Sequence, residues 1–349
     1  MRQHPPIRPS RPFAWLIALL VAAWPLVAGA QTRPAGVPGH LFFWKVTSPK
    51  ATVYLLGSVH LMRRDMYPLP VEVEEAFQKS DYLACEINLN TALQGNAVQE
   101  MMSKALYTDG RTLFDVLSRQ DAAKLRKALA ERNLPEFMFK TMKPWMAAAM
   151  LPTMDALADG YTETGVDQHF MNLAAGRKIP IREVESVESQ LDALADMPED
   201  MQIKWLESQL VPPAEVKEAM AALTASWSTG DQRALSKVAT EDMSSQPALE
   251  KRLVLDRNDH MTRVVEGYLT QPGIGFVVVG AAHLTGKSGV VAQLRAKGYP
   301  VVLLPVTLRS RAALAAVAAL QAESRPAATS PGPRPQAPEH AVPAGPSGR

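Results

Sequence analysis

The sequence predicts an α/β fold with a mixed central sheet, flanking helices and a large helical insertion that caps the sheet. Short apolar runs of strand type lie near both ends of the chain. The long sequence between them is rich in alanine, leucine, methionine, glutamate and lysine, most of which favour helices. A strand–helix–strand spacing near the carboxyl terminus is typical of a βαβ unit. We therefore expect both ends of one domain, residues 39–310, to supply the sheet.

The chain starts with the features of a secretory signal peptide. Three arginines precede the apolar stretch 13–27, and the small residues 28–30 follow it. The stretch is short for a membrane span and contains Pro25, which argues against an uncleaved anchor. We expect a signal peptide over residues 1–30 and a linker over 31–38. The mature protein is then exported to the periplasm and keeps no stable membrane anchor.

The first strands are predicted to form an antiparallel hairpin. Apolar runs at 41–46 and 52–56 flank a Ser-Pro turn, and the second run leads into the first histidine motif described below. A helix over 71–79 then leads to a strand over 82–86. Further strands are expected at 179–185, 276–280 and 299–304.

Long helical stretches separate these strands. The segments 90–165 and 190–255 are expected to cap the sheet because they contain most of the helical sequence. The predicted helices span residues 97–106, 119–131, 136–150, 165–176, 198–210, 214–228 and 245–269.

The last part of the domain has the βαβ spacing. Strand 276–280, helix 288–297 with Gly298 as its cap, and strand 299–304 follow one another, which indicates parallel pairing at the second histidine motif. Residues 311–349 are expected to hold the end of a helix and a disordered tail. The last 26 residues contain seven prolines and almost no large apolar side chains.

Charge and cysteine content exclude several classes of function. Lys and Arg number 37 against 35 Asp and Glu, and loss of the signal peptide removes three arginines and no acid. The mature chain is then nearly neutral, which gives no reason to expect nucleic acid as a partner. Cys85 is the only cysteine, so an intramolecular disulfide and a cysteine-based zinc site are excluded. The sequence does not indicate an oligomeric state.

Two segments of the chain are near copies of each other. In residues 54–61 and 277–284 an apolar strand ends at a glycine, and a histidine follows three residues later, as Gly57 to His60 and Gly280 to His283. We expect each glycine to permit a tight bend at the strand exit. Ligand sites of α/β sheets lie at the carboxyl ends of the strands, so the two histidines are predicted to converge there.

Two acids end other predicted strands on the same edge. Glu86 closes the run 82–86 and Glu185 closes 179–185. Together with His60 and His283 they form a donor set that suits a first-row divalent ion such as Mn, Fe, Co or Zn. The alternative for each acid is a solvated strand end or a partner for an arginine.

Arg257 is a further candidate, in a polar interruption of a helical region. It is suited to hold a substrate carboxylate or to stabilise an oxyanion. A surface ion pair within its own helix is the alternative.

These motifs resemble the TraB/GumN family, whose relatives include the Tiki proteases. The resemblance covers about residues 40–305 in the order of the family. The segments that support it are Leu56-Gly57-Ser58-Val59-His60, Glu86, Thr164-Gly165-Val166-Asp167 with 179–185, Leu255-Asp256-Arg257-Asn258 and Val279-Gly280-Ala281-Ala282-His283.

The resemblance implies an α/β core with helical elaborations and, as in Tiki-like relatives, a metal-dependent peptidase. His60, His283 and Glu86 then become candidate catalytic or metal residues, with Arg257 and Asp167 as supporting candidates. The chain departs from Tiki because it has no evident membrane anchor at its carboxyl terminus.

The leading hypothesis is an exported, metal-dependent hydrolase that cleaves a peptide or protein substrate. His60, His283 and Glu86 hold the metal, Arg257 orients the substrate, and Glu185 or Asp167 supports the ligands. One alternative is a protein of the same fold that binds metal or haem without chemistry. The other is an assembly factor whose helical cap contacts envelope or polysaccharide machinery.

Overall fold

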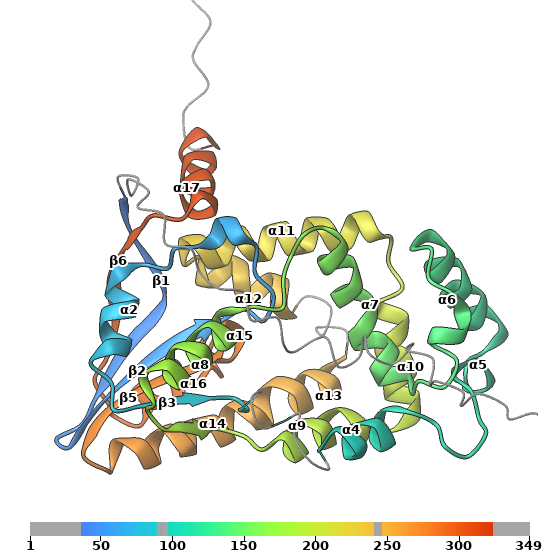
Figure 1. The fold of residues 1–349 in the computed structure, drawn as a ribbon, viewed down its shortest axis with the longest axis horizontal. Helices are drawn as coiled ribbons and strands as arrows, with labels where there is room; N and C mark the ends of the chain where they lie inside the picture. The colour runs from blue at the N-terminus through green and yellow to red at the C-terminus, as the bar shows by residue number, and fades with distance from the viewer. Residues whose placement is uncertain (1–35, 89–91, 93–96, 241–245, 324–349) are drawn as a thin grey trace, which may run out of the picture.

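The computed structural model describes residues 36–88, 92, 97–240 and 246–323 of the chain. The sheet lies at one end of the molecule and the helical cap extends away from it (Figure 1). The sheet is mixed, has six strands and runs in the order β4-β3-β5-β2-β1-β6. Each predicted strand is present. The strands are β1 (Val37–Thr47), β2 (Ala51–Ser58), β3 (Tyr82–Cys85), β4 (Ile181–Glu183), β5 (Gly273–Gly280) and β6 (Val301–Leu308).

The predicted hairpin is confirmed. Strands β1 and β2 pair antiparallel. The Ser48 hydroxyl stabilises their turn by accepting hydrogen bonds from the backbone N–H groups of Lys50 and Ala51. β1 begins at Val37, so its first two residues belong to the stretch predicted as linker.

The strands of the two histidine motifs are neighbours. Strand β5 pairs in parallel with β2 on one side and with β3 on the other. The parallel pairing predicted at the second motif is therefore made with these strands. β6 runs in the same direction but pairs antiparallel with β1, so the crossover through α16 (Val290–Ala296) passes over two strands.

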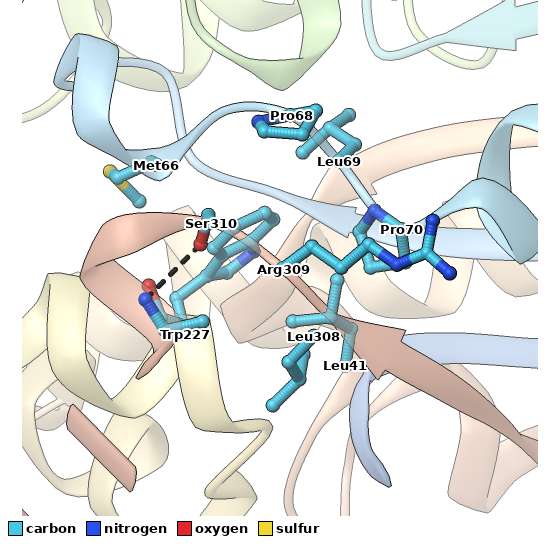
Figure 2. Close-up of a pocket in the computed structure, with 11 residues that line it drawn as sticks. Leu41, Met66, Pro68, Leu69, Pro70, Trp227, Leu308, Arg309 and Ser310 are labelled. Carbon is cyan, nitrogen blue, oxygen red and sulfur yellow. Dashed lines mark hydrogen bonds between the residues drawn. The ribbon is translucent and has the colours of Figure 1, made fainter. Parts of the chain in front are cut away.

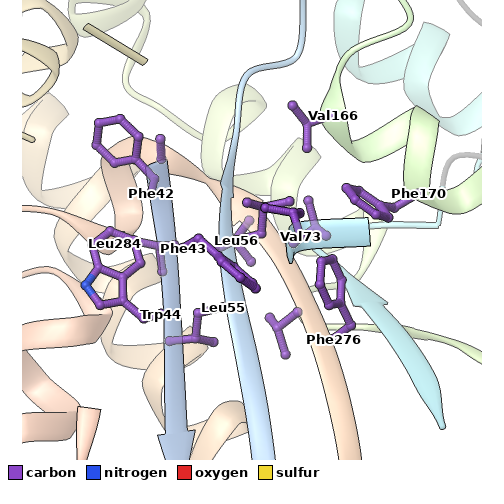
Figure 3. Packing of buried hydrophobic residues seen from close by; sticks show 14 of the residues in the cluster. Phe42, Phe43, Trp44, Leu55, Leu56, Val73, Val166, Phe170, Phe276 and Leu284 are labelled. Carbon is purple, nitrogen blue, oxygen red and sulfur yellow. The ribbon is translucent and has the colours of Figure 1, made fainter. Parts of the chain in front are cut away.

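Both faces of the sheet are covered. Four consecutive residues of β1, 41–44, are buried, which requires packing on either side of the strand. Phe276 of β5 packs against Phe77 of α2 (Val71–Gln78) at 5.4 Å and against Phe170 of α8 (Val166–Arg177) at 4.8 Å between ring centroids. Figure 3 shows this cluster, with Phe42, Trp44 and Leu284 lying apart from the rings around Phe276. The site at the strand ends thus stands on a rigid core.

The predicted cap is present and has a hydrophobic core of its own. Leu125, Phe139, Leu151 and Leu206 are among its fully or nearly fully buried members. Its helices in the first segment are α4 (Ala97–Ala105), α5 (Leu113–Val116), α6 (Arg119–Glu131) and α7 (Pro144–Ala158), and those in the second begin with α9 (Val187–Ala195) and α10 (Glu199–Ser208).

One predicted cap helix has the wrong bounds. A helix was expected over 136–150, but α7 begins at Pro144, and only a short 3-10 turn, η2 (Glu136–Met138), precedes it. Proline has no backbone N–H and favours the first position of a helix. A helix that continued through residue 144 would lose a hydrogen bond there.

The rest of the chain returns from the cap to the sheet. The helix predicted over 245–269 is divided, because a π-helical segment follows its first turn. Figure 1 shows α13 (Pro247–Glu250) and α14 (Asp256–Leu269) along the bottom of the view, below the strands, whereas α11 (Pro213–Thr229) lies along the top. The elements are α11 (Pro213–Thr229), α12 (Gln232–Thr240), α13 (Pro247–Glu250), η3 (Lys251–Leu255), α14 (Asp256–Leu269), α15 (Ala281–Leu284) and α17 (Arg311–Glu323).

The terminal predictions fall mostly outside the described residues. The signal peptide over 1–30 and the proline-rich tail from residue 324 both lie there. Within the described part of the chain, no helix is long and apolar enough to span a bilayer.

Candidate functional site

The two histidine motifs leave the sheet side by side. Ser58, the last residue of β2, lies opposite Gly280, the last residue of β5. His60 follows two residues after β2, and His283 lies in the short helix α15. Because the strands are parallel neighbours, both imidazoles reach the same edge of the sheet, as predicted.

The chain bends tightly at Gly280, where β5 ends and α15 begins, but close packing and not backbone freedom explains the motif glycines. Gly280 has a φ of −50°, and Gly57 lies in regular strand without a positive φ. A Cβ at Gly57 would lie 2.6 Å from the Cβ of Phe42 and 2.9 Å from the Cα of Ala281. A Cβ at Gly280 would lie 3.2 Å from Oε1 of Glu86. The glycines therefore let helices and a carboxylate approach the strand ends.

His60 is oriented by Asp167 at the start of α8. Its Nδ1 lies 3.1 Å from Oδ2 of Asp167, and the Ser58 hydroxyl donates to Oδ1 of the same carboxylate at 2.8 Å. The His60 side chain is 68% exposed, and it lines the cavity described below. The negative charge of Asp167 raises the pKa of His60 to about 9.

The turn that carries His60 is tied to the start of α8. The backbone N–H of Val166 donates to the Val59 carbonyl at 3.1 Å. A Cβ at Gly165 would lie 2.3 Å from the His60 carbonyl oxygen and 2.4 Å from that of Val59. Only glycine fits at this contact, so Gly165 sets the position of Asp167 relative to the imidazole.

His283 is oriented by Asn258 of α14. Asn258 Nδ2 donates to the Ser288 carbonyl, so its Oδ1 faces His283 Nδ1, at 2.7 Å, as an acceptor. The proton of the neutral ring therefore resides on Nδ1. His283 is buried, and this burial lowers its pKa to about 4.

Both rings therefore have the same arrangement. Each makes its hydrogen bond through Nδ1 to a side-chain oxygen, and Nε2 makes none to the described residues. Metal-binding histidines typically donate one ring N–H to an oxygen and bind the ion through the other nitrogen.

Glu86 is buried beside the two histidines. Its Oε1 accepts the Gly280 N–H at 2.6 Å, and its Oε2 accepts Nη2 of Arg257 at 2.7 Å and Nε2 of Gln190 at 2.9 Å. Burial raises the pKa of Glu86, but the opposing effects of His283, Arg257, His60 and the Gly280 N–H outweigh it and lower the pKa to about 2. The carboxylate is therefore ionised at neutral pH.

Arg257 and Glu185 form a buried ion pair next to Glu86. Nε and Nη2 of Arg257 lie 3.0 Å from Oε1 and 2.6 Å from Oε2 of Glu185, and Gln190 also donates to Glu185. The surface ion pair considered for Arg257 is not observed, because its partners are two buried acids on β-strand ends. An arginine partner, the alternative considered for both acids, is present.

The structure thus gathers all six predicted residues: His60, His283, Glu86, Glu185, Arg257 and Asp167. No three His, Cys, Asp or Glu side chains of the described chain form a preassembled metal cluster. Three further polar groups of the site were not singled out as site residues. Ser58 lies within the repeated motif and Asn258 is next to Arg257, so both had a local signal, whereas Gln190 of α9 had none.

The site opens into a cavity of about 720 Å³. Its size is in the range of pockets that bind small ligands and peptide segments. The polar residues of its lining include both histidines, Glu86 and Arg257. The apolar residues include Met220 and Leu223 of α11 and Leu235 and Val238 of α12.

A second cavity, between the 66–70 segment, Trp227 and the end of β6, has only about 10 Å³ (Figure 2). It holds no more than a single water. The site at the strand ends is therefore the better candidate for a ligand.

The buried, neutral His283 should make the protein sensitive to acid. Its pKa is 6.5 in the unfolded chain and about 4 in the folded one, so between these values the unfolded state binds more protons. Stability is therefore lost as the pH falls from 6.5 towards 4, by about 3 kcal/mol from this group. His283→Asn keeps a hydrogen-bond donor to Asn258 but removes the imidazole, which takes up a proton in this pH range.

Urea unfolding at pH 7 and pH 4 checks this expectation. The stability loss between the two pH values should be about 3 kcal/mol smaller in His283→Asn than in wild type. Equal losses would show that His283 is not held neutral by burial.

Comparison with known proteins agrees with the resemblance seen in the motifs. The sequence model of the TraB/PrgY/gumN family matches residues 42–302, which include both histidine motifs and the cap. A protein of Treponema pallidum (strain Nichols), described as uncharacterized, is 23% identical over 274 residues, covering 72% of this chain and 80% of that protein. The uncharacterized protein YbaP of Escherichia coli (strain K12) is 23% identical over 277 residues, covering 77% and 99%. No solved structure matches the chain.

Proposed function

The chain belongs to the TraB/PrgY/gumN family, and we propose that it is an exported, metal-dependent hydrolase that cleaves peptide bonds in the cavity at the strand ends. The observation that supports this most is the matched arrangement of His60 and His283. Two rings from distant parts of the sequence are each fixed through Nδ1, which leaves Nε2 of each for a ligand.

In this proposal Nε2 of His60, Nε2 of His283 and a carboxylate oxygen of Glu86 would hold a divalent cation. This donor set suits Mn, Fe, Co or Zn. Because burial keeps His283 neutral at pH 7, its lone pair is available without loss of a proton. His60, whose pKa is raised to about 9, has to release the proton on Nε2 when it binds the ion. The bound ion supplies Lewis acidity, which polarises a carbonyl and lowers the pKa of water.

The remaining polar residues position these ligands. Asp167 and Asn258 fix the tautomer and orientation of the two rings. Arg257 contacts Glu86 and Glu185 with the same guanidinium, so we assign it the role of holding Glu86 in place instead of the predicted contact with substrate. Glu185 fixes Arg257 in turn.

A cleavage assay on purified mature protein tests this function. Protein treated with EDTA should not cleave a library of internally quenched peptides, and added Mn, Co or Zn should restore cleavage. His283→Asn should remain inactive under every condition. The matched control is His40→Asn, because His40 is exposed on β1 and contacts the Leu304 carbonyl through Nδ1. Metal binding without cleavage of any peptide would favour the alternative of a binding protein without chemistry.

A further inference from the structure

Glu163 is the one acid lining the cavity that has no hydrogen bond or ion pair with the described residues. The other acids of the site are all engaged. Asp167 binds Ser58 and His60, and Glu86 binds Arg257. Glu163 is half-buried, and this burial raises its pKa.

The backbone on either side of Glu163 is fixed. Thr162 forms an antiparallel bridge with Met62, with N···O distances of 2.8 and 3.1 Å. Val166 is bonded to Val59. Glu163 therefore stands on a short loop that is tied at both ends to the turn carrying His60.

Cations of the adjacent elements are bound elsewhere. Arg63 contacts the carboxylate and the carbonyl of Asp159, and Lys217 of α11 pairs with Asp159 as well. Arg257 is held by two other acids. In the described part of the chain, no lysine or arginine therefore neutralises Glu163.

The lining has an excess of negative charge when no metal is bound. Its three acids, Glu86, Asp167 and Glu163, exceed the positive charges of Arg257 and of protonated His60 by one. A ligand with one positive charge is therefore complementary to this cavity. The apolar part of the lining that Met220 and Leu223 of α11 and Leu235 and Val238 of α12 supply is suited to an aliphatic group.

We propose that Glu163 selects substrates by binding a primary ammonium group, while an aliphatic side chain close to that group packs against α11 and α12. The inference rests on the proposed function only in treating the bound peptide as a substrate, since binding itself needs no cleavage. Two sources supply this chemistry: the amino terminus of a peptide and the side chain of a lysine.

Calorimetry with three short peptide amides tests the proposal on EDTA-treated full-length mature protein. The first is Leu-Leu-Ala-Gly with a free amino terminus, the second is its acetylated form, and the third is acetylated with lysine at the first position. In wild type we expect at least one ammonium-bearing peptide to bind about tenfold more tightly than the acetylated leucine peptide. Which of the two does so identifies the source of the ammonium.

Glu163→Gln keeps the size of the side chain and removes its charge. In this variant the preference should fall to less than about twofold, with an unchanged melting temperature. Glu75→Gln is the matched control, because Glu75 lies exposed on α2 beside Lys79, and it should keep the preference.

An unchanged preference in Glu163→Gln would overturn the proposal, and so would equal or undetectable binding of all three peptides to wild type. Because these measurements are made without metal, they are independent of the cleavage assay. Metal-dependent cleavage without an effect of Glu163→Gln would leave the proposed function intact and remove only this inference.

Discussion

Arg257→Met is expected to destabilise the protein by about 3–5 kcal/mol. The guanidinium pairs with both Glu86 and Glu185, which are buried. The two acids come from the ends of neighbouring strands. Removal of the cation leaves two carboxylates together in a poorly solvated place. Methionine fills much of the volume of the arginine side chain. The loss of stability is therefore expected to come from the unpaired charges and not from a cavity.

The pH dependence separates these two causes. Without Arg257, burial and the nearby acid raise the pKa of Glu86, so the folded variant takes up a proton as the pH falls. The difference in stability between wild type and variant should therefore shrink between pH 7 and pH 5. Chemical denaturation at both values measures it. A constant difference would point to lost packing.

Arg263→Met provides the matched control. Arg263 lies on the same helix, α14, with an exposed side chain, and its replacement should change stability by no more than about 0.5 kcal/mol. A loss below about 1 kcal/mol in Arg257→Met would contradict the description of this pair as a buried structural support.

His60→Asn and His283→Asn are each expected to lower metal affinity by more than about 100-fold and to abolish metal-dependent hydrolysis. Asparagine can reproduce the donor that Nδ1 presents to Asp167 or Asn258, but it has no atom in the place of Nε2. The orienting residues alone typically account for 10- to 100-fold in metal affinity, so loss of a ligand should cost at least as much. The double variant should be little worse than either single one, because the two ligands act as a unit.

The central strands β2, β3 and β5 were predictable because each has a continuous buried stretch, covered on both faces. A continuous apolar run such as 276–280 indicates a buried strand when Gly or Pro lies close by. Helix bounds were less predictable. Pro144 starts α7, although composition favours helix on both sides of it, and the short helices α9 and α12 were not among the predicted ones.

The convergence of the histidines followed from local repetition. A strand that ends in Gly-X-X-His places its imidazole at the sheet edge, and two such strands in one parallel sheet place both there. Partners could not be assigned in the same way. The contact between Arg257 and Glu185 spans 72 residues, and Gln190 lies on a helix whose docking depends on tertiary packing.

The role of the motif glycines also required the structure. The sequence suggested backbone freedom, whereas Gly57 and Gly280 are needed because Ala281 and Glu86 approach them closely. Such contacts come from elements that are distant in the sequence, so a single motif does not reveal them.

The central claim is that His60 and His283 share one metal ion, and Mn titration by calorimetry tests it most directly. Wild-type protein and His40→Asn should each bind one ion with the same affinity. His60→Asn and His283→Asn should each lose this binding while keeping the wild-type circular dichroism spectrum and melting cooperativity. Binding of full strength in either motif variant would contradict the claim, because the two histidines would then not belong to one metal site.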